Sequence, residues 1–587
     1  MTLQRSPNVR SASKALRRFC KAHRDRTSTL TDAWSALHVC VLELQPPPRE
    51  GVFSGYCFHG SDYVFGQTGA SHFELNTGRA IRPGLDGWYL TIRPGPNGTV
   101  VGCDAIGFQR IYYFRSSCSG CWAISNSVEV LAEHLRHHGV LLEADPAALA
   151  NSLVKAEFAT CATTFETCFR GVRLLPSWLQ LRIASGGLSV EPVEELPKMG
   201  YADSLRSFIE LWISRFETLL SNDELSVACQ LTGGKDSRAV FSLLTAAARR
   251  LQQPLPKGIS AVCGRFNYAL RDYEVAEQLA QKWGVPFNSF PPSSSILNDT
   301  ASYLNWRRFS LAAYKPIHFP PSIPEAKRIH FSGVGGENFR PFYKALSVEQ
   351  FLEKSACEPR WLWSLWTNSV RATFGTLSDH APGFDPLLLH YRKFRTRIHG
   401  GRTPGTEVCF QPLASQILNQ AKLSPQQVAD GQLLVDVIAS CDYDLLLEPY
   451  DDPAKMPSAP VLDRVSRIKP SAEPAPGRCY YGTADDWPAV TGSQGASPRA
   501  RLNLLLEDFE AVSRDSRVRS FVGDELIGAG QSVLKRAAES EAGQLAHAWD
   551  GLPVSSVMTA GLAFGILPAV SAQAKDSTPS SPSTSTR

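Results

Sequence analysis

The chain has little excess charge of either sign. Its 60 Lys and Arg residues stand against 56 Asp and Glu over 587 residues, which leaves a net charge of +4. So small an excess gives no strongly basic surface, and we expect no nucleic-acid partner. The N-terminus also lacks an apolar stretch of signal-peptide length, and the 14 cysteines are scattered. We therefore expect free thiols in a reducing, cytoplasmic compartment.

Metal-binding and membrane-spanning patterns are scarce as well. Cys118 and Cys121 have CxxC spacing, but no second pair and no histidines follow at zinc-site spacing, so we interpret SSCSGC as a hairpin turn. Residues 554–570 carry no charge and are just long enough to span a bilayer. Because this segment contains Pro568 and several Ser, Thr and Gly residues, we expect a packed helix and no membrane partner.

The length predicts more than one domain, because a single hydrophobic core rarely grows so large. Residues 1–49 form a basic arm, and residues 50–195 contain short alternating runs such as WYLTIRP and RIYYF, separated by turn residues. These runs predict a β-rich domain. In residues 200–570, strands alternate with helices and then give way to helices, which predicts an α/β domain with a parallel sheet and a helical C-terminal part. Residues 571–587 are a polar tail that we expect to be disordered.

A glycine-rich loop follows the first expected strand of the α/β domain. The strand 225–231 runs into the sequence TGGKDSR at residues 232–238. Ligands of parallel sheets bind at such strand ends, where glycines and a helix N-terminus present N–H groups to phosphate. Asp236 can hold Mg²⁺ and Ser237 can donate its hydroxyl, although the residue order differs from a Walker A loop. The alternative is an ordinary Gly-Gly turn with an aspartate N-cap.

A second loop of the same kind favours the nucleotide site. Residues 332–339 read SGVGGENF and directly follow the expected strand RIHF. We expect Asp236 and Glu337 to ligate one Mg²⁺–pyrophosphate group from two neighbouring strand ends. The residues that we predict to bind ATP are Leu231, Thr232, Gly233, Gly234, Lys235, Asp236, Ser237, Val262, Ser332 and Gly333.

The order of these loops resembles the asparagine synthetase family, whose members carry SGGxDS and then SGxGxDE. Upstream, DGWY at 86–89, DAIG at 104–107 and residues 164–176 resemble segments of that family's glutaminase domain. The resemblance covers roughly residues 50–470. It implies an α/β fold in which a β-rich domain of the N-terminal-nucleophile hydrolase type precedes a PP-loop ATP pyrophosphatase domain.

Three features depart from the family pattern. The glutaminase nucleophile is a cysteine at position 2, where this chain has Thr2, and neither Cys20 nor Cys57 can take its place without processing. Glu337 and Asn338 stand where the family has Asp and Glu. Val334 stands where ammonia-using members have Glu and β-lactam-forming relatives have Tyr. In lacking the glutaminase cysteine, the chain is similar to β-lactam synthetases and lasso-peptide cyclases.

The resemblance implies a ligase that uses ATP and Mg²⁺ to adenylate a small-molecule or peptide carboxylate and then joins it to an amine. Lys455 and Lys469 are the candidates for the lysine near the α-phosphate. Glu407 and residues 391–397 are the candidates for a base that replaces the one missing at Val334.

The sequence leaves two roles open for each of two arginines. Arg238 and Arg340 each follow an acidic loop and could bind phosphate or pair with the neighbouring acid.

The alternatives to this ligase are an ordinary asparagine synthase that uses glutamine or ammonia and a non-catalytic nucleotide-binding scaffold. A homodimer is one assembly that this interpretation allows.

Overall fold

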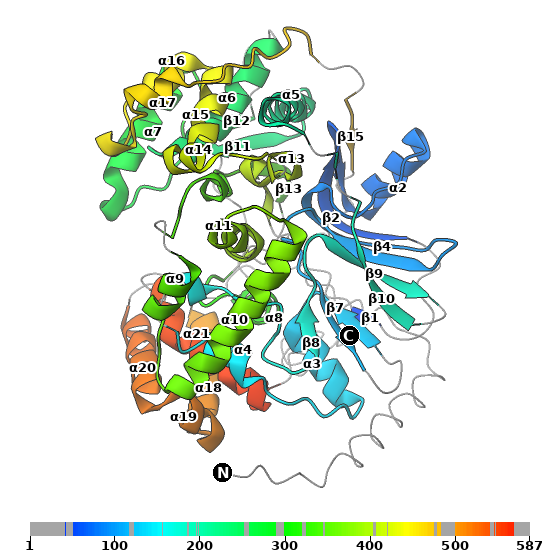
Figure 1. Ribbon diagram of the computed structural model, residues 1–587, viewed down its shortest axis with the longest axis vertical. Helices are drawn as coiled ribbons and strands as arrows, with labels where there is room; N and C mark the ends of the chain where they lie inside the picture. Colours follow the sequence, from blue (N-terminus) through cyan, green and yellow to red (C-terminus); the bar gives the residue numbers. More distant parts are fainter. Residues whose placement is uncertain are drawn as a thin grey trace, which may run out of the picture.

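The computed structural model describes much of the chain between residues 41 and 568. The described residues are 41–42, 51–116, 122–154, 157–184, 187–194, 196–197, 199–251, 258–288, 299–319, 325–343, 347–402, 407–419, 421–474, 478–482, 499–540, 545 and 548–568. They form a mixed α/β structure with both antiparallel and parallel sheets (Figure 1), which confirms the α/β class expected from the sequence.

Two sheets, built mainly of antiparallel strands, make up the N-terminal region. The larger has the order β10 (Gly187–Pro192), β9 (Leu179–Ala184), β5 (Thr99–Cys103), β4 (Asp86–Arg93), β2 (Val52–His59), β3 (Asp62–Phe65) and β15 (Tyr480–Tyr481). The smaller has the order β1 (Val41–Leu42), β7 (Trp122–Ser125), β6 (Tyr112–Arg115) and β8 (Val172–Leu174). Buried apolar residues of both sheets, such as Ile92, Val101 and Ile124, form one cluster, so the two sheets share a core. β15 joins β3 in parallel and brings residues from far along the chain to the sheet edge.

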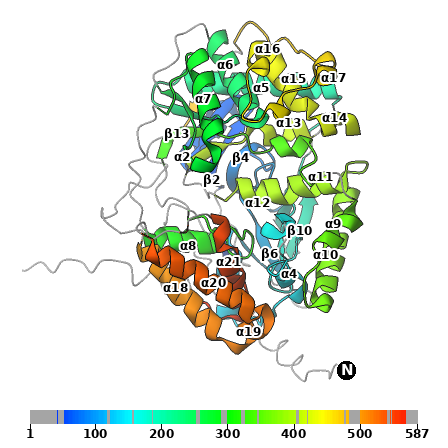
Figure 2. The same ribbon diagram turned by 90° about the vertical axis from the view of Figure 1, so that its left-hand side faces the viewer.

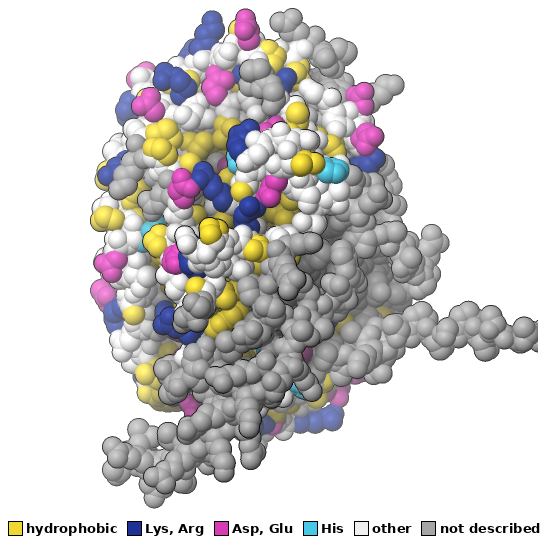
Figure 3. Space-filling view, turned by 90° about the vertical axis from the view of Figure 1, so that its right-hand side faces the viewer, with side chains coloured by type: hydrophobic (Ala, Val, Ile, Leu, Met, Phe, Trp, Pro, Cys, Tyr) yellow, Lys and Arg dark blue, Asp and Glu magenta, His cyan; other side chains and the backbone are white. Residues whose placement is uncertain are grey.

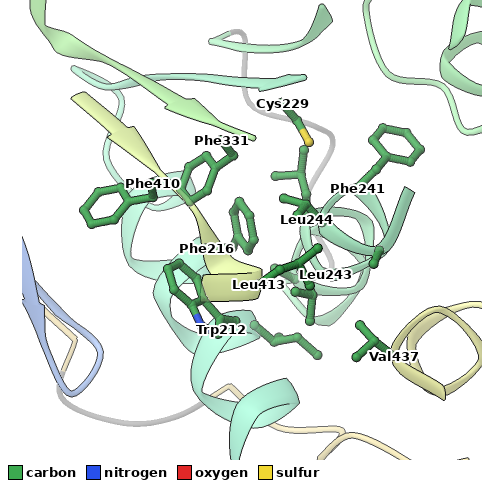
Figure 4. Packing of buried hydrophobic residues seen from close by; sticks show 14 of the residues in the cluster. Trp212, Phe216, Cys229, Phe241, Leu243, Leu244, Phe331, Phe410, Leu413 and Val437 are labelled. Carbon is green, nitrogen blue, oxygen red and sulfur yellow. The ribbon is translucent and has the colours of Figure 1, made fainter. Parts of the chain in front are cut away.

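A four-stranded parallel sheet lies beside this region. Its order is β12 (Ile259–Val262), β11 (Ser226–Gln230), β13 (Glu325–Phe331) and β14 (Glu407–Phe410). Val227, Cys229, Ile259, Ile329 and Phe331 of these strands are buried, because helices and aromatic side chains cover the sheet. α5 (Tyr201–Leu220), α6 (Lys235–Arg250) and α15 (Gln432–Cys441) contribute to the same core, which includes Trp212, Phe331 and Val437 (Figure 4).

The N-terminal region packs onto the edge strand β14. The Phe58 ring on β2 lies 4.6 Å from the Phe410 ring and 5.8 Å from Trp212. The Tyr56 hydroxyl donates to the Cys409 carbonyl at 3.1 Å and accepts from the Cys409 N–H at 2.8 Å. These contacts join the larger antiparallel sheet and the parallel sheet through one hydrophobic core.

Two further groups of helices lie outside this core (Figure 2). One contains α4 (Pro146–Ala150), α9 (Val348–Lys354), α10 (Arg360–His380) and α11 (Pro386–His390). The other contains α3 (Val128–His137), α8 (Asp299–Phe309), α18 (Arg499–Arg514), α19 (Ser516–Val522), α20 (Asp524–Glu539) and α21 (Leu552–Phe564). In this second group the buried Arg307 guanidinium forms ion pairs with Glu129 and with Asp508, at 2.9 Å to the latter. The C-terminal helices therefore pack against the N-terminal region as well as against α8.

Further helices and turns complete the described structure. They are α2 (Gly66–Thr77), α7 (Leu270–Lys282), α12 (Arg397–Gly400), α13 (Gln416–Asn419), α14 (Pro425–Asp430), α16 (Tyr443–Leu447) and α17 (Ala459–Asp463), a π-helical turn at Tyr391–Thr396, and 3₁₀ turns at Glu157–Thr160, Asn267–Ala269, Gly336–Phe339, Pro412–Ala414, Pro453–Lys455 and Ala548–Gly551. On the face shown in Figure 3, acidic and basic side chains lie interspersed.

The uncharged segment 554–570 is helical in its first part. α21 is buried along most of its length in the helical group at the C-terminus, which confirms the expected packed helix. Among the described residues, no helix is both long and apolar enough to cross a membrane. Cys118 and Cys121 lie outside the described residues, although β6 and β7 on either side of them do pair antiparallel. The basic arm, apart from Val41 and Leu42, and the tail 571–587 also lie outside them.

Candidate functional site

The two glycine-rich loops lie side by side at the carboxyl ends of neighbouring parallel strands. Cys229 on β11 pairs with Phe331 on β13, so the loops that follow these strands leave the same edge of the sheet. On the other side, Gln230 pairs with Val262 at the end of β12, and the Val262 carbonyl accepts from the Leu231 N–H at 3.0 Å. The sheet thus brings three of the predicted strand ends to one place.

The first loop is held in shape by its own hydroxyl groups. The Ser237 hydroxyl accepts from the Thr232 N–H and also lies 3.0 Å from the Thr232 hydroxyl. We expected Ser237 to donate to a phosphate, and in this structure it closes the turn instead. Gly234 is the N-cap of α6 and provides no side-chain cap. The first N–H groups of this 16-residue helix therefore have no capping side chain and point where an anion can bind.

Asp236 and Glu337 converge on a single guanidinium. Arg340 Nη2 lies 2.6 Å from Asp236 Oδ2 and 3.3 Å from Glu337 Oε1. The two carboxylates are thus no further apart than these two contacts allow, on two loops separated by about a hundred residues of sequence. Arg340 pairs with the acids, which was one of the two roles open to it from the sequence.

Burial dominates the electrostatics of Asp236. The pKa of its carboxyl is raised to about 6, first by burial and then by the nearby Glu337 carboxylate, while Arg340 and then Lys455 oppose the shift. Burial also lowers the pKa of Lys235, and the positive charge of Arg340 adds to that effect. A cation beside the ionised Asp236 carboxylate would therefore be stabilised.

Glycines allow the acidic side chains to approach the loops closely. A Cβ atom on Gly336 would lie 2.0 Å from Asp236 Oδ1, and one on Gly233 would lie 2.3 Å from the Asp451 Cβ. The Asp451 N–H donates to the Gly233 carbonyl at 3.3 Å, and the Gly233 N–H donates to Asp272 on α7 at 2.9 Å. Asp451 and Asp272 thus belong to the site.

We did not single out either aspartate for a role from the sequence. Asp272 carried a weak signal, because it lies in the first turn of α7, the helix that follows strand β12. Asp451 carried another, because it begins an Asp-Asp pair four residues before Lys455.

The residues fit a hydrated magnesium ion bound together with phosphate. The Oδ1 atoms of Asp236 and Asp451 are buried, and neither has a hydrogen-bond donor among the described residues. Within that part of the chain, no group of three or more His, Cys, Asp or Glu side chains could hold a metal by itself. A magnesium ion here would therefore take most of its ligands from phosphate oxygens and water, as Mg²⁺ usually does in nucleotide sites.

The structure separates the two lysine candidates. Lys455 lies beside the first loop, where its Nζ forms an ion pair with Asp451. Lys469 is exposed, and its neighbour Ile468 donates its N–H to Ser440 at the end of α15, beside the last turn of α6. Since α6 has 16 residues and is about 24 Å long, Lys469 lies far from the loop at the opposite end of that helix.

The candidates for a replacement base also differ in position. Glu407 is the first residue of β14, so its backbone lies at the amino end of the strand, away from the loops. Tyr391 begins the π-helical turn. It lies close enough to Glu337 and Arg340 for both charges to affect its pKa. Burial raises that pKa well above the ordinary value, so the hydroxyl is protonated at neutral pH. Val334 is half-buried in the second loop.

Arg238 is not available to a ligand. Its fully buried guanidinium donates to the carbonyls of Leu445, Glu448 and Pro449 at 2.7 to 3.0 Å and lies 3.7 Å from the centre of the Tyr450 ring. The suggestion from the sequence that Arg238 grips phosphate is wrong for this reason. The arginine instead fixes the segment that leads to Asp451 against the first helix of the site.

Cys57, which we considered as a glutaminase nucleophile, lies inside β2. It pairs with Val64 on one side and Gly87 on the other, and it is fully buried. Burial raises its thiol pKa far above the ordinary value, which disfavours the reactive thiolate.

No known protein-family model matches this chain, and no curated protein is found to be similar to it.

Proposed function

We propose that this chain is an ATP-dependent ligase that activates a carboxylate as an acyl-adenylate and passes it to an amine. The observation that carries the proposal is the convergence of Asp236 and Glu337 from two glycine-rich loops at adjacent parallel strand ends. Such strand ends bind phosphates through backbone N–H groups and a helix N-terminus. The proposal also rests on the order of the loops, which resembles the asparagine synthetase family.

In this proposal the chain supplies binding and charge rather than covalent chemistry. The N-terminus of α6 would hold a phosphate group, and Lys455 would neutralise negative charge beside the first loop. Asp236 and Glu337 would contribute ligands to Mg²⁺, whose other ligands would be phosphate oxygens and water, and Mg²⁺ when bound helps pyrophosphate to leave. Arg340 now lies between these two acids, so it would have to move or share them when the ion binds.

The finer domain assignment is part of the same proposal. We infer that residues 50–195 are a glutaminase-like domain without activity and that the parallel sheet belongs to a PP-loop domain. The buried position of Cys57 supports the lack of glutaminase activity. Glutamine would not serve as the nitrogen source, and a separate amine or one within the same substrate would attack the adenylate.

One observation favours a second candidate, a nucleotide-binding scaffold without turnover. Arg340 bridges the two acids, and an arginine that stayed there at saturating Mg²⁺ would keep the ion out. ATP–pyrophosphate exchange with a panel of carboxylic acids separates the candidates. A ligase shows acid-dependent exchange that Asp236→Asn abolishes, whereas a scaffold binds ATP and shows no exchange with any acid.

A further inference from the structure

A cavity lined mostly by apolar and aromatic side chains adjoins the carboxylate pair. Building on the proposed function, we propose that it binds the organic part of the carboxylate substrate. The geometry points to an acid with a bulky aromatic or branched aliphatic group, and not to aspartate.

The cavity is large enough for such a group. Its volume is about 410 Å³, within the range of small-molecule sites. Its lining includes Phe342, Tyr343, Leu388, Tyr391, Leu423 and Val428. Three of these side chains form an aromatic cluster, with ring centroids of Tyr391 at 4.6 Å from Phe342 and 5.6 Å from Tyr343.

The cavity begins where the acidic site ends. Pro341, the residue after Arg340, belongs to its lining. So does Arg392, which donates to the carbonyl of Asn338, the residue after Glu337, at 2.8 Å. Another wall is α14. A carboxylate at the loops would therefore have its organic group directed into the cavity.

The charged residues of the lining are used within the protein. Asp385 caps α11 by accepting from the Leu388 N–H at 2.7 Å. Arg392 donates to the Asn338 carbonyl at 2.8 Å and lies over the rings of Phe339 and Phe384. Lys422 is exposed. A second carboxylate, such as that of aspartate, would lose its hydration here, which is costly, and the buried cation that it would meet, Arg392, already donates its Nε–H to Asn338 and packs on two rings.

Equilibrium dialysis can test the cavity separately from the reaction. The probes are 4-phenylbutyrate, 4-phenylbutanamide, which lacks the carboxylate, and L-aspartate, each with the full chain. Val428→Phe fills the cavity from the half-buried face of α14, and Leu388→Trp fills it from α11. Leu365→Trp is the matched control, because Leu365 is 39% exposed on α10 and does not line the cavity. Thermal unfolding verifies that each variant is folded.

We expect 4-phenylbutyrate to bind saturably and L-aspartate not to bind. Each filling variant should weaken 4-phenylbutyrate at least about tenfold, a loss equal to about 1.4 kcal/mol, while Leu365→Trp should leave it unchanged. The amide should bind more weakly than the acid, because it lacks the charge that the phosphate loop attracts. The inference is overturned if aspartate binds and 4-phenylbutyrate does not, or if folded filling variants bind as the parent does.

The two proposals fail in different ways. Binding of 4-phenylbutyrate to Asp236→Asn, with no exchange by the parent for any acid, would keep the cavity assignment and refute the ligase. Acid-dependent exchange with aspartate alone would keep the ligase and refute the cavity assignment.

Discussion

Replacing Gly336 by alanine tests whether the closeness of the two loops matters for catalysis. The backbone of Gly336 has no positive φ, so alanine can adopt its conformation. The added methyl group would nevertheless lie 2.0 Å from Asp236 Oδ1 and 2.4 Å from its Cγ. Because such contacts under 3.0 Å essentially never occur, the Asp236 carboxylate has to shift by about 1 Å, which can cost roughly 10²-fold in rate.

The effect on stability should be much smaller than the effect on activity. Overpacking costs about 1–3 kcal/mol, and the loss of backbone freedom in the unfolded chain returns about 0.4–1 kcal/mol. We expect Gly336→Ala to remain folded, to unfold at a slightly lower urea concentration, and to lose about 100-fold in ATP–pyrophosphate exchange. Isothermal titration with Mg²⁺·ATP should show weaker binding whose dependence on Mg²⁺ is reduced.

Gly375→Ala is the matched control for this substitution. Gly375 lies inside α10, and a Cβ atom there would meet nothing within 4 Å. Alanine should stabilise the helix by roughly 0.5–1 kcal/mol and leave exchange unchanged. A folded Gly336→Ala protein that exchanges at the parent rate would refute the reasoning, since Asp236 would then not need its position beside the second loop.

Four further outcomes follow from the same structure. The pKa of Asp236 is raised to about 6, and Mg²⁺ binds the ionised carboxylate. The affinity for Mg²⁺·ATP at subsaturating Mg²⁺, measured by titration calorimetry, should therefore fall about tenfold from pH 7 to pH 5. An affinity that does not change with pH would contradict this. Lys455→Ala should lower exchange about 100-fold, while Lys469→Ala, at the far end of α6, should exchange like the parent. Arg238→Ala leaves three carbonyls without their donor and should cost at least about 3 kcal/mol in urea unfolding; a smaller loss would mean that water replaces the guanidinium. Cys57 should react with iodoacetamide only in denaturant. Labelling of Cys57 in the native protein, measured by mass spectrometry, would contradict its burial and make it a candidate glutaminase nucleophile again.

The sequence predicts well where the two loops of the site lie, because the position of each loop depends on the residues next to it in the sequence. A glycine-rich run after an apolar strand fixes where a loop forms, and parallel strands place such loops at one edge. The meeting of Asp236 and Glu337 follows from those two facts. What the loops do with their hydroxyls does not follow, because Ser237 is as able to close its own turn as to bind a phosphate.

Contacts between distant segments are what the sequence does not reveal. Asp451 reaches Gly233 across more than two hundred residues, and nothing local indicates which strand end the segment will approach. For Arg238 the sequence suggests a ligand contact that the structure does not have. Arg238 follows the loop, but on α6 its side chain points inward and donates to carbonyls at the end of α16. The direction of a helical side chain depends on the face that packs, which is decided by tertiary structure.

The N-terminal region has a structural role that does not need a nucleophile. β14 is the edge strand of the parallel sheet, and an uncovered edge would expose its backbone and the Phe410 ring. The Tyr56 hydroxyl forms hydrogen bonds with both the N–H and the carbonyl of Cys409, and Phe58 packs against Phe410. The larger antiparallel sheet therefore covers this edge of the parallel sheet. The 3₁₀ turn Pro412–Ala414 begins two residues after the end of this strand, and a Cβ atom on Gly335 of the second loop would lie 2.6 Å from the Ala414 N. The contacts thus run from the N-terminal sheet through β14 to the loop that carries Glu337. For this reason the larger antiparallel sheet supports the position of the acidic site even though Cys57 is buried within it.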